Sequence, residues 1–200
     1  MGLARLISHV LFDGWLRCHA GSYIVGFANK NYVLIEQFKT DVKRLVDAHF
    51  YERRRENDVY EVELSSKFLW KFLNDFTSNL DLLAKFLEED EKKITEFLRA
   101  FWDDEGTISI DLKKRSIKLR GRQKDEKVRN FLLELHREIG IPAREDYDRL
   151  GIIISRRDNL KKFFEKIGFS HGVKIGRGKG NLRYGKEKLQ VLREILNQKL

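Results

Sequence analysis

Two acidic residues, Asp13 and Glu105, each stand between an apolar segment and a glycine. The segments are LISHVLFDG and LRAFWDDEG, and their apolar residues recur every three or four positions, which is typical of a buried helix. Glu105 lies eleven residues after Ile94, which is about three helical turns, so it points along the same apolar face. A carboxylate on such a face has to be paired or bound to a cation.

The residue types at these two places predict a divalent metal. Carboxylates without a His or Cys cluster favour Mg²⁺ (or Mn²⁺), which keeps several waters and takes further ligands from phosphate. Such ions stabilise the attacking and leaving oxygens of a displacement at phosphorus, so the predicted chemistry is phosphodiester hydrolysis. The alternative is that both acids are ordinary helix ends before a capping glycine.

The end of the second helix makes a further electrostatic demand. Asp103, Asp104 and Glu105 lie where the helix dipole is already negative. We therefore expect a positive group opposite them.

The two acidic segments belong to a longer repeat. Asp13 and Glu105 are 105 − 13 = 92 positions apart, and the same offset places Phe27–Lys30 on Leu119–Arg122. Near an offset of 90, VELS at 62–65 falls on IIIS at 152–155. The sequence therefore predicts one structural unit that occurs twice.

The two segments resemble the two copies of the signature motif of the LAGLIDADG homing endonucleases, in the single-chain form that joins two pseudo-symmetric halves. The resemblance covers residues from about 3 to about 170. Ser8 and Ala100 stand where that family often has glycine, and both are small. The resemblance implies an α+β fold of duplicated αββαββα units, with the two motif helices packed at the centre and antiparallel sheets forming a DNA-binding saddle.

The resemblance also implies roles for individual residues. Asp13 and Glu105, with the adjoining Gly14 and Gly106, would hold the metal. A polar and a basic residue at the end of a DNA-facing strand would support catalysis, and an offset of 92 gives these positions: Asn29 and Lys30 in the first half, Gly121 and Arg122 in the second. Gly121 departs from the amide side chain that the family usually has there.

Basic residues alternate along the predicted strands, as expected for a sheet that lies in the major groove. The candidates for DNA binding are Arg17, Arg53, Arg55, Lys113, Lys118 and Arg120. The first hairpin is less basic, with Ile24, Gly26 and Ala28 where the second has charged residues. The unequal faces predict a long, asymmetric target site.

The hydrophobic pattern divides the chain into four parts. We predict a first half at 1–79, a connecting helix at 80–93, a second half at 94–170, and a tail at 171–200. Each half begins with a hairpin after its motif helix, followed by an amphipathic helix, a second hairpin and a further helix. In the tail, residues 172–185 are glycine-rich and basic, which suits either a loop that contacts a nucleic-acid backbone or a plain linker, and 186–200 has helical spacing.

Composition limits the partners. The formal net charge of +9 and the pI of about 9.6 favour a polyanion, most simply double-stranded DNA. The single cysteine, Cys18, excludes an internal disulfide and a multi-cysteine zinc site, and we expect an intracellular location, in the cytoplasm or nucleoid. No apolar run is long enough for a membrane span. The five histidines have no ligand spacing, and we assign them no catalytic role.

The sequence therefore predicts a monomeric, Mg²⁺-dependent, intron-encoded DNA endonuclease. One alternative is a non-cleaving nucleic-acid-binding protein on the same fold, either a maturase with intron RNA as its partner or a DNA-binding regulator. Another is the endonuclease domain of an intein, which we consider less well supported because the sequence has no flanking splicing segments.

Overall fold

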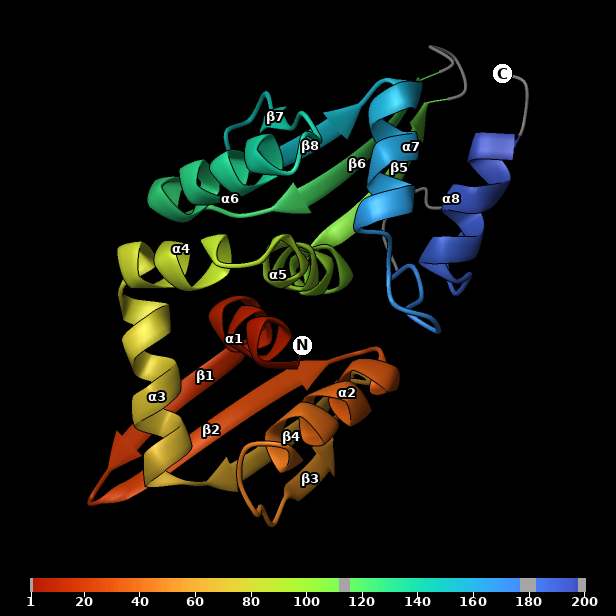
Figure 1. Cartoon of the computed structure of the whole chain (residues 1–200). Helices are drawn as coiled ribbons and strands as arrows, with labels where there is room; N and C mark the ends of the chain where they lie inside the picture. Colours follow the sequence, from red (N-terminus) through yellow and green to blue (C-terminus); the bar gives the residue numbers. More distant parts are fainter. Residues whose placement is uncertain (1, 112–115, 177–182, 198–200) are drawn as a thin grey trace. The chain divides into compact units, whose positions relative to one another are not determined.

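The computed structural model describes residues 2–111, 116–176 and 183–197. The chain divides into two compact units, Met1–Phe97 and Leu98–Leu200. Each unit contains a four-stranded antiparallel sheet and helices, so the predicted α+β class is confirmed (Figure 1). Among the described residues, no helix has the length and apolar character that crossing a bilayer requires. Lys113, a predicted DNA-binding residue, lies outside the described residues.

The first unit has the predicted order αββαββα, followed by a further helix. Its elements are α1 (Gly2–Phe12), β1 (Gly14–His19), β2 (Ser22–Asn29), α2 (Tyr32–Lys43), β3 (Tyr51–Arg54), β4 (Tyr60–Ser65), α3 (Lys67–Ser78) and α4 (Leu80–Glu88). The predicted connecting stretch is not one continuous helix, because α4 ends at Glu88 and α5 begins at Glu91. The side chain of Asp90 accepts the amide of Lys92 at 2.9 Å at this break.

The second unit repeats the order. Its elements are α5 (Glu91–Asp104), β5 (Gly106–Asp111), β6 (Ser116–Arg122), α6 (Glu126–Glu138), β7 (Arg144–Glu145), β8 (Gly151–Ser155), α7 (Arg157–Lys166) and α8 (Lys188–Asn197). Helix α5 starts within the first unit and carries its motif into the second. The strand predicted near 143–148 is reduced to the two residues of β7.

The two sheets have the same connectivity. The strand order is β1-β2-β4-β3 in the first and β5-β6-β8-β7 in the second, and all neighbouring strands are antiparallel. In both sheets the strand after the motif helix forms a hairpin with the next strand, which then pairs with the second hairpin. The shared order supports the predicted duplication.

Each sheet buries one face against helices. In the first unit Val25, Phe27 and Val62 are fully buried, and α1, α2 and α3 contact these strands. In the second unit Leu119 and Ile154 are fully buried, while the alternate residues of β6 are exposed. Val25 and Phe27 therefore lie on the core side of the first sheet. We call the other side of each sheet its open face.

The C-terminal segment is packed into the second unit. The amide of Ile175 donates to the carbonyl of Lys186 at 2.8 Å, and the amide of Lys188 donates to the carbonyl of Val173 at 2.8 Å. Val173 is fully buried, and Val191 of the predicted C-terminal helix is as well. The helix α8 contacts α7 and β5.

Candidate metal and nucleic-acid site

Asp13 occupies the junction between α1 and β1. Its amide donates to the carbonyl of His9 at 3.1 Å, which closes the last helical turn, and its own carbonyl accepts the amide of Ala28 at 3.3 Å. A Cβ atom on Gly14 would lie 2.6 Å from Cα of Val10, so only glycine lets the chain turn from helix to strand this closely. The motif therefore fixes the backbone of Asp13 between a helix and a sheet.

Glu105 occupies the same place in the second unit. Its amide donates to the carbonyl of Phe101 at 2.8 Å, and its carbonyl accepts the amide of Arg122 at 3.4 Å. A Cβ atom on Gly106 would lie 2.2 Å from the carbonyl oxygen of Trp102. Asp13 and Glu105 thus have equivalent backbone hydrogen bonds and equivalent following glycines, each within its own unit.

The side chain of Asn29, at the end of β2, holds the carboxylate of Asp13. Its Nδ2 donates to Oδ2 of Asp13 at 2.9 Å, and its Oδ1 accepts the amide of Asn31 at 2.9 Å. Because Asn29 is 9% exposed, this amide is largely removed from solvent. Lys30 follows directly and is exposed.

The strand register corrects the counterparts that we assigned to Asn29 and Lys30 from the sequence. Gly14 pairs with Phe27, whereas Gly106 pairs with Gly121, so Phe27 and Gly121 are equivalent. Four residues lie between β5 and β6 but only two between β1 and β2, which shifts the offset from 92 to 94 within the hairpin. The counterparts of Asn29 and Lys30 are therefore Gln123 and Lys124, and the counterpart of Arg122 is Ala28.

A local hydrogen bond supports the corrected register. Oε1 of Gln123 accepts the amide of Asp125 at 2.9 Å, just as Oδ1 of Asn29 accepts the amide two residues further on. An amide side chain thus occupies this turn in both units. Sequence reasoning missed Gln123 and Lys124 because it applied one fixed offset, although Asn29-Lys30 and Gln123-Lys124 are similar dipeptides.

Gly121 has a packing role. A Cβ atom there would lie 2.6 Å from Cζ of Phe101, a buried residue of α5. The equivalent residue of the first unit, Phe27, is itself fully buried and contacts the ring of His9 at 4.7 Å between ring centres. The aromatic ring at this place comes from the strand in the first unit and from the helix in the second. Gly121 is therefore not the position at which an amide side chain is to be expected.

The positive group that the end of α5 requires is Lys188. Its Nζ donates to the carbonyl of Asp103 at 2.7 Å and to that of Trp102 at 3.1 Å, and the residue is 4% exposed. A cation at a helix C-terminus is favoured by the helix dipole. The sequence predicted the need for this charge but gave no sign that it would come from the tail.

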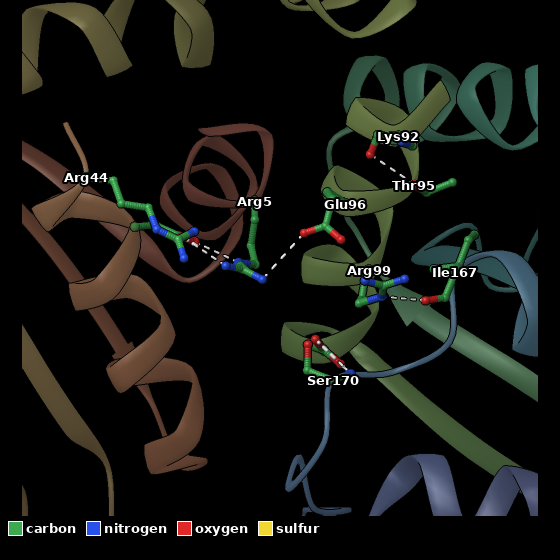
Figure 2. Close-up of polar contacts among 10 residues, drawn as sticks. Arg5, Arg44, Lys92, Thr95, Glu96, Arg99, Ile167 and Ser170 are labelled. Atoms are coloured by element: carbon green, nitrogen blue, oxygen red, sulfur yellow. Dashed lines mark hydrogen bonds and ion pairs between the residues drawn. The ribbon is translucent and has the colours of Figure 1, made fainter. Parts of the chain in front are cut away.

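Further contacts hold α5 within the second unit. The side chain of Asp103 accepts the amide of Ser170 at 3.0 Å, and Nε of Arg99 donates to the carbonyl of Ile167 at 2.5 Å (Figure 2). Asp103 is 1% exposed, so its carboxylate serves this buried contact.

The helix α1 is held by charged contacts within the first unit. Arg5 donates from Nε and Nη2 to the two carboxylate oxygens of Asp41 on α2, at 2.7 and 2.8 Å, and its Nη1 lies 3.4 Å from Oε2 of Glu96 (Figure 2). The hydroxyl of Ser8 donates to the carbonyl of Phe97 at 2.8 Å. Ser8 is therefore both small and hydrogen-bonded at its place in the motif.

The predicted DNA-binding arginines of the first unit lie against carboxylates. Arg53 and Arg55 contact the two oxygens of Glu61 at 2.5 and 2.6 Å, and Arg17 contacts Glu63 at 2.8 Å. Glu61 is 5% exposed. Burial alone would raise the pKa of Glu61, but hydrogen bonds from Arg53 and Arg55 outweigh it and lower the pKa below its usual range.

Trp15 completes this cluster on the open face of the first sheet. Its Nε1 donates to Oε1 of Glu63 at 3.2 Å, and the guanidinium of Arg17 lies 5.2 Å from its ring centre. A Cβ atom on Gly26 would lie 2.2 Å from the indole ring, so Trp15 packs directly over that glycine.

The second sheet presents its predicted cations differently. Lys118, Arg120 and Arg122 are exposed on β6, as their alternation predicted. Arg120 forms ion pairs with Asp146 and Asp148 in the segment between β7 and β8. The pKa of Asp148 is lowered, chiefly by the backbone amide of Leu150 and then by Arg120.

His136 and Trp102 form a buried polar pair in the core of the second unit. The indole Nε1 of Trp102 donates to Nε2 of His136 at 3.0 Å, and Nδ1 of His136 lies 2.7 Å from the carbonyl of Leu132. Burial lowers the pKa of His136 to about 4. The ring is therefore neutral and structural, in agreement with the absence of a predicted catalytic role.

The available oxygen ligands suit a metal ion whose coordination shell is completed by the substrate. Within 2–111, 116–176 and 183–197, no three His, Cys, Asp or Glu residues cluster so that they could hold a metal alone. Each unit instead offers one motif carboxylate, fixed by its backbone. Hard carboxylate and carbonyl oxygens suit Mg²⁺, which commonly binds through one or two carboxylates together with waters and substrate phosphates.

Residues 92–168 match the family model described as a LAGLIDADG-like domain. These residues are thus similar to a LAGLIDADG-like domain. The family resemblance that the two motifs indicate is thereby confirmed. In the LAGLIDADG-like domain, Glu105 ends the motif helix, and Gln123 and Lys124 follow the second strand.

The similarity in fold extends beyond residues 92–168. The crystal structure of I-DmoI in complex with DNA and Ca has a TM-score of 0.60 and 17% identity, covering 84% of this chain and 90% of that one. Full-length DUF199/WhiA from Thermatoga maritima has a TM-score of 0.61 and 14% identity, covering 98% of this chain and 59% of that one. At these identities the likeness shows the fold alone.

A curated relative is the replication factor C small subunit of Pyrococcus furiosus, which is 27% identical over 174 residues. The match covers 86% of this chain but 19% of that protein. The chain thus spans about a fifth of the curated relative it matches.

Proposed function

We propose that this LAGLIDADG protein is a site-specific, metal-dependent endonuclease that hydrolyses both strands of a long, asymmetric DNA site. The observation that carries the proposal is the matched setting of Asp13 and Glu105. Each acid ends a motif helix, each carbonyl accepts an amide from the second strand, and an amide side chain occupies the same turn beyond it. Two acidic residues in equivalent backbone settings suit a reaction that is carried out once on each of two DNA strands.

The residues divide the work as follows. Asp13 and Glu105, with the backbone of Gly14 and Gly106, would hold the Mg²⁺ or Mn²⁺ ions. When bound, such an ion supplies a Lewis acid for phosphate and lowers the pKa of a coordinated water. Asn29 orients the carboxylate of Asp13 through its 2.9 Å hydrogen bond.

Cations beside the acids would stabilise the charge that develops on phosphate. Lys30 and its register counterpart Lys124 are exposed directly after the strand ends and suit this role. Arg122 keeps its proposed place near the scissile phosphate because its amide contacts the carbonyl of Glu105. Gln123 would take in the second unit the part that Asn29 takes in the first.

The open faces would supply recognition. Lys118 and Arg120 in the second unit, and Arg17, Arg53 and Arg55 in the first, are proposed to contact DNA. The solved structures of I-DmoI contain DNA with Ca or Mn, or target DNA in the presence of Mg, which supports DNA and a divalent metal as partners here. We further propose a monomer, an intracellular location and an intron as the coding element.

The test is a selection of cleaved sites from a DNA library, run with Mg²⁺ and with EDTA. An Asp13→Asn/Glu105→Gln protein serves as the inactive control, because both substitutions keep size while removing charge. We expect metal-dependent cleavage at one long site, absent in the double variant, which still binds the site. Tight DNA binding without cleavage under every metal condition would reject the endonuclease.

A second candidate is a DNA- or RNA-binding protein without nuclease activity. On the open face of the first sheet, Glu61 forms ion pairs with Arg53 and Arg55, and Glu63 with Arg17. These carboxylates reduce the positive charge available to phosphate, which favours a surface that binds nucleic acid selectively. The fold similarity to DUF199/WhiA, which has an N-terminal LAGLIDADG domain, is compatible with the same alternative. Binding of intron RNA in preference to duplex DNA would favour a maturase.

A further inference from the structure

We infer that Lys188 is a positioning residue that fixes the end of α5 and thereby the placement of Glu105. This inference rests on the proposed metal-binding role of Glu105. The ammonium of Lys188 bridges the carbonyls of Asp103 and Trp102, at 2.7 and 3.1 Å. Both carbonyls lie in the last turn of α5, which ends at Asp104. These two residues directly precede Asp104 and Glu105.

The position of Lys188 is itself well determined. It is the first residue of α8, and its amide donates to the carbonyl of Val173 at 2.8 Å. Its ammonium lies 5.3 Å from the ring centre of Phe169, and the residue is 4% exposed. A buried ammonium needs several hydrogen-bond acceptors, so the two carbonyls and the lysine depend on one another.

The effect on Glu105 follows from the backbone. Carbonyls in the last turn of a helix have no partner within the helix, and a helix end without such partners frays. Lys188 supplies partners on one side, and the contact between the carbonyl of Glu105 and the amide of Arg122 holds the chain on the other. The residue that carries the proposed metal ligand is therefore held between a cation and a strand.

Among residues 2–97, the same element order does not place a buried lysine on the helix that follows α3. The helix that follows α7 is α8, with the buried Lys188, whereas the helix that follows α3 is α4, whose lysine, Lys85, is exposed. Asp13 accepts a hydrogen bond from the side chain of Asn29, whose counterpart in the second unit is Gln123. The Lys188 contacts lie within the second unit, so we expect their removal to weaken the placement of Glu105 without changing that of Asp13.

The experiment compares Lys188→Met with Lys186→Met, which removes an exposed lysine from the same segment. Hydrogen exchange is followed in the full chain, on peptides that cover Phe101–Gly106. Because the bridge would be lost, we expect exchange at the end of α5 to rise about tenfold in Lys188→Met, with the α1 end unchanged. In Lys188→Gln, whose side chain can still donate to one carbonyl, we expect an intermediate exchange rate at the end of α5. This variant keeps the test informative if Lys188→Met fails to fold.

A second readout measures metal directly. Mn²⁺ is titrated into each protein with a mixed-sequence DNA duplex and followed by electron paramagnetic resonance. We expect Lys188→Met to raise the Mn²⁺ dissociation constant about tenfold, as is usual when a group that orients a metal ligand is removed. Asp13→Asn on top of Lys188→Met should weaken binding further, because it acts on the other ligand.

The outcomes separate this inference from the proposed function. Unchanged exchange at the α5 end, or a uniform rise throughout the second unit, would overturn the positioning role. Local exchange that rises while Mn²⁺ binding stays as in the wild type would show that Lys188 caps the helix without serving a metal ligand, and would also overturn it. Wild-type protein that binds Mn²⁺ at Glu105 but cuts no DNA would reject the endonuclease and leave the inference standing.

Discussion

The amide nitrogen of Asn29 lies 2.9 Å from Oδ2 of Asp13 and donates a hydrogen bond to it. The orientation of that amide is set by its other end, because Oδ1 accepts the backbone amide of Asn31 at 2.9 Å. The side-chain amide is a neutral donor, so this hydrogen bond orients the carboxylate without forming an ion pair with it. The arrangement therefore fixes the direction of the Asp13 carboxylate, which suits a ligand for a cation.

Removing this support should slow cleavage without abolishing DNA binding. We expect Asn29→Ala to lower single-turnover cleavage about 10- to 100-fold, the range found when a group that orients a metal ligand is removed. Raising the Mg²⁺ concentration should recover part of the rate. Asn57→Ala, in an exposed turn, is the matched control and should leave the rate as it is. Equal rates for both variants would contradict the role of Asn29.

The corrected register predicts which second-unit cation corresponds to Lys30. We expect Lys30→Met and Lys124→Met each to lower the cleavage rate about 100- to 1,000-fold at saturating protein, because each would remove charge stabilisation at phosphate. Arg122→Met should lower DNA affinity as well as the rate. Its counterpart in the first unit is Ala28, so this cation occurs in one unit and not at the equivalent position of the other. Strand-resolved nicking assays measure this. A normal rate in Lys124→Met with a reduced rate in Arg122→Met would restore the assignment made from the sequence offset.

The limits of sequence reasoning are visible in this hairpin. Alternation placed Lys118, Arg120 and Arg122 on an exposed face, and helical spacing located both motif helices, because these patterns are local. Equivalence across the repeat is not local. Two extra residues between β5 and β6 change the offset, and the dipeptides Asn29-Lys30 and Gln123-Lys124 mark the correct alignment only once the strand pairing is known.

Contacts between distant segments were the other limit. The helix dipole predicted a cation near Asp103, but identifying Lys188, which lies 188 − 103 = 85 residues later, requires the packing of the tail. The pairing of Arg53 and Arg55 with Glu61 was likewise invisible, since a basic strand and an acidic strand give no register by themselves.

The carboxylate of Glu61 should restrain nonspecific DNA binding. Glu61→Gln would release Arg53 and Arg55, so we expect nonspecific affinity to rise several-fold and its salt dependence to steepen by up to about two phosphate contacts. Fluorescence anisotropy with a mixed-sequence duplex at several KCl concentrations measures both. Glu56→Gln changes the same charge in the exposed turn of this hairpin. If that control raised affinity equally, net charge alone would explain the result.

The buried His136 should make the stability of the second unit depend on pH. Its Nε2 accepts the indole hydrogen of Trp102 at 3.0 Å, so the folded state requires the neutral ring, with Nδ1 donating to the carbonyl of Leu132. Burial lowers its folded pKa to about 4 from a usual value of 6.5. Between these values the unfolded chain binds the extra proton, so stability present above pH 6.5 is lost as the pH falls toward 4.

Urea unfolding between pH 4 and 7.5 measures this loss. The slope contributed by one such group approaches about 1.4 kcal/mol per pH unit within the window. His136→Asn should be less stable than the wild type at pH 7.5 by about 1–3 kcal/mol, because it disturbs a buried hydrogen-bonded pair, yet it should lose this part of the pH dependence. His49→Gln, which changes an exposed histidine, should keep it. Identical pH slopes in the wild type and His136→Asn would mean that His136 becomes protonated without cost in the folded state.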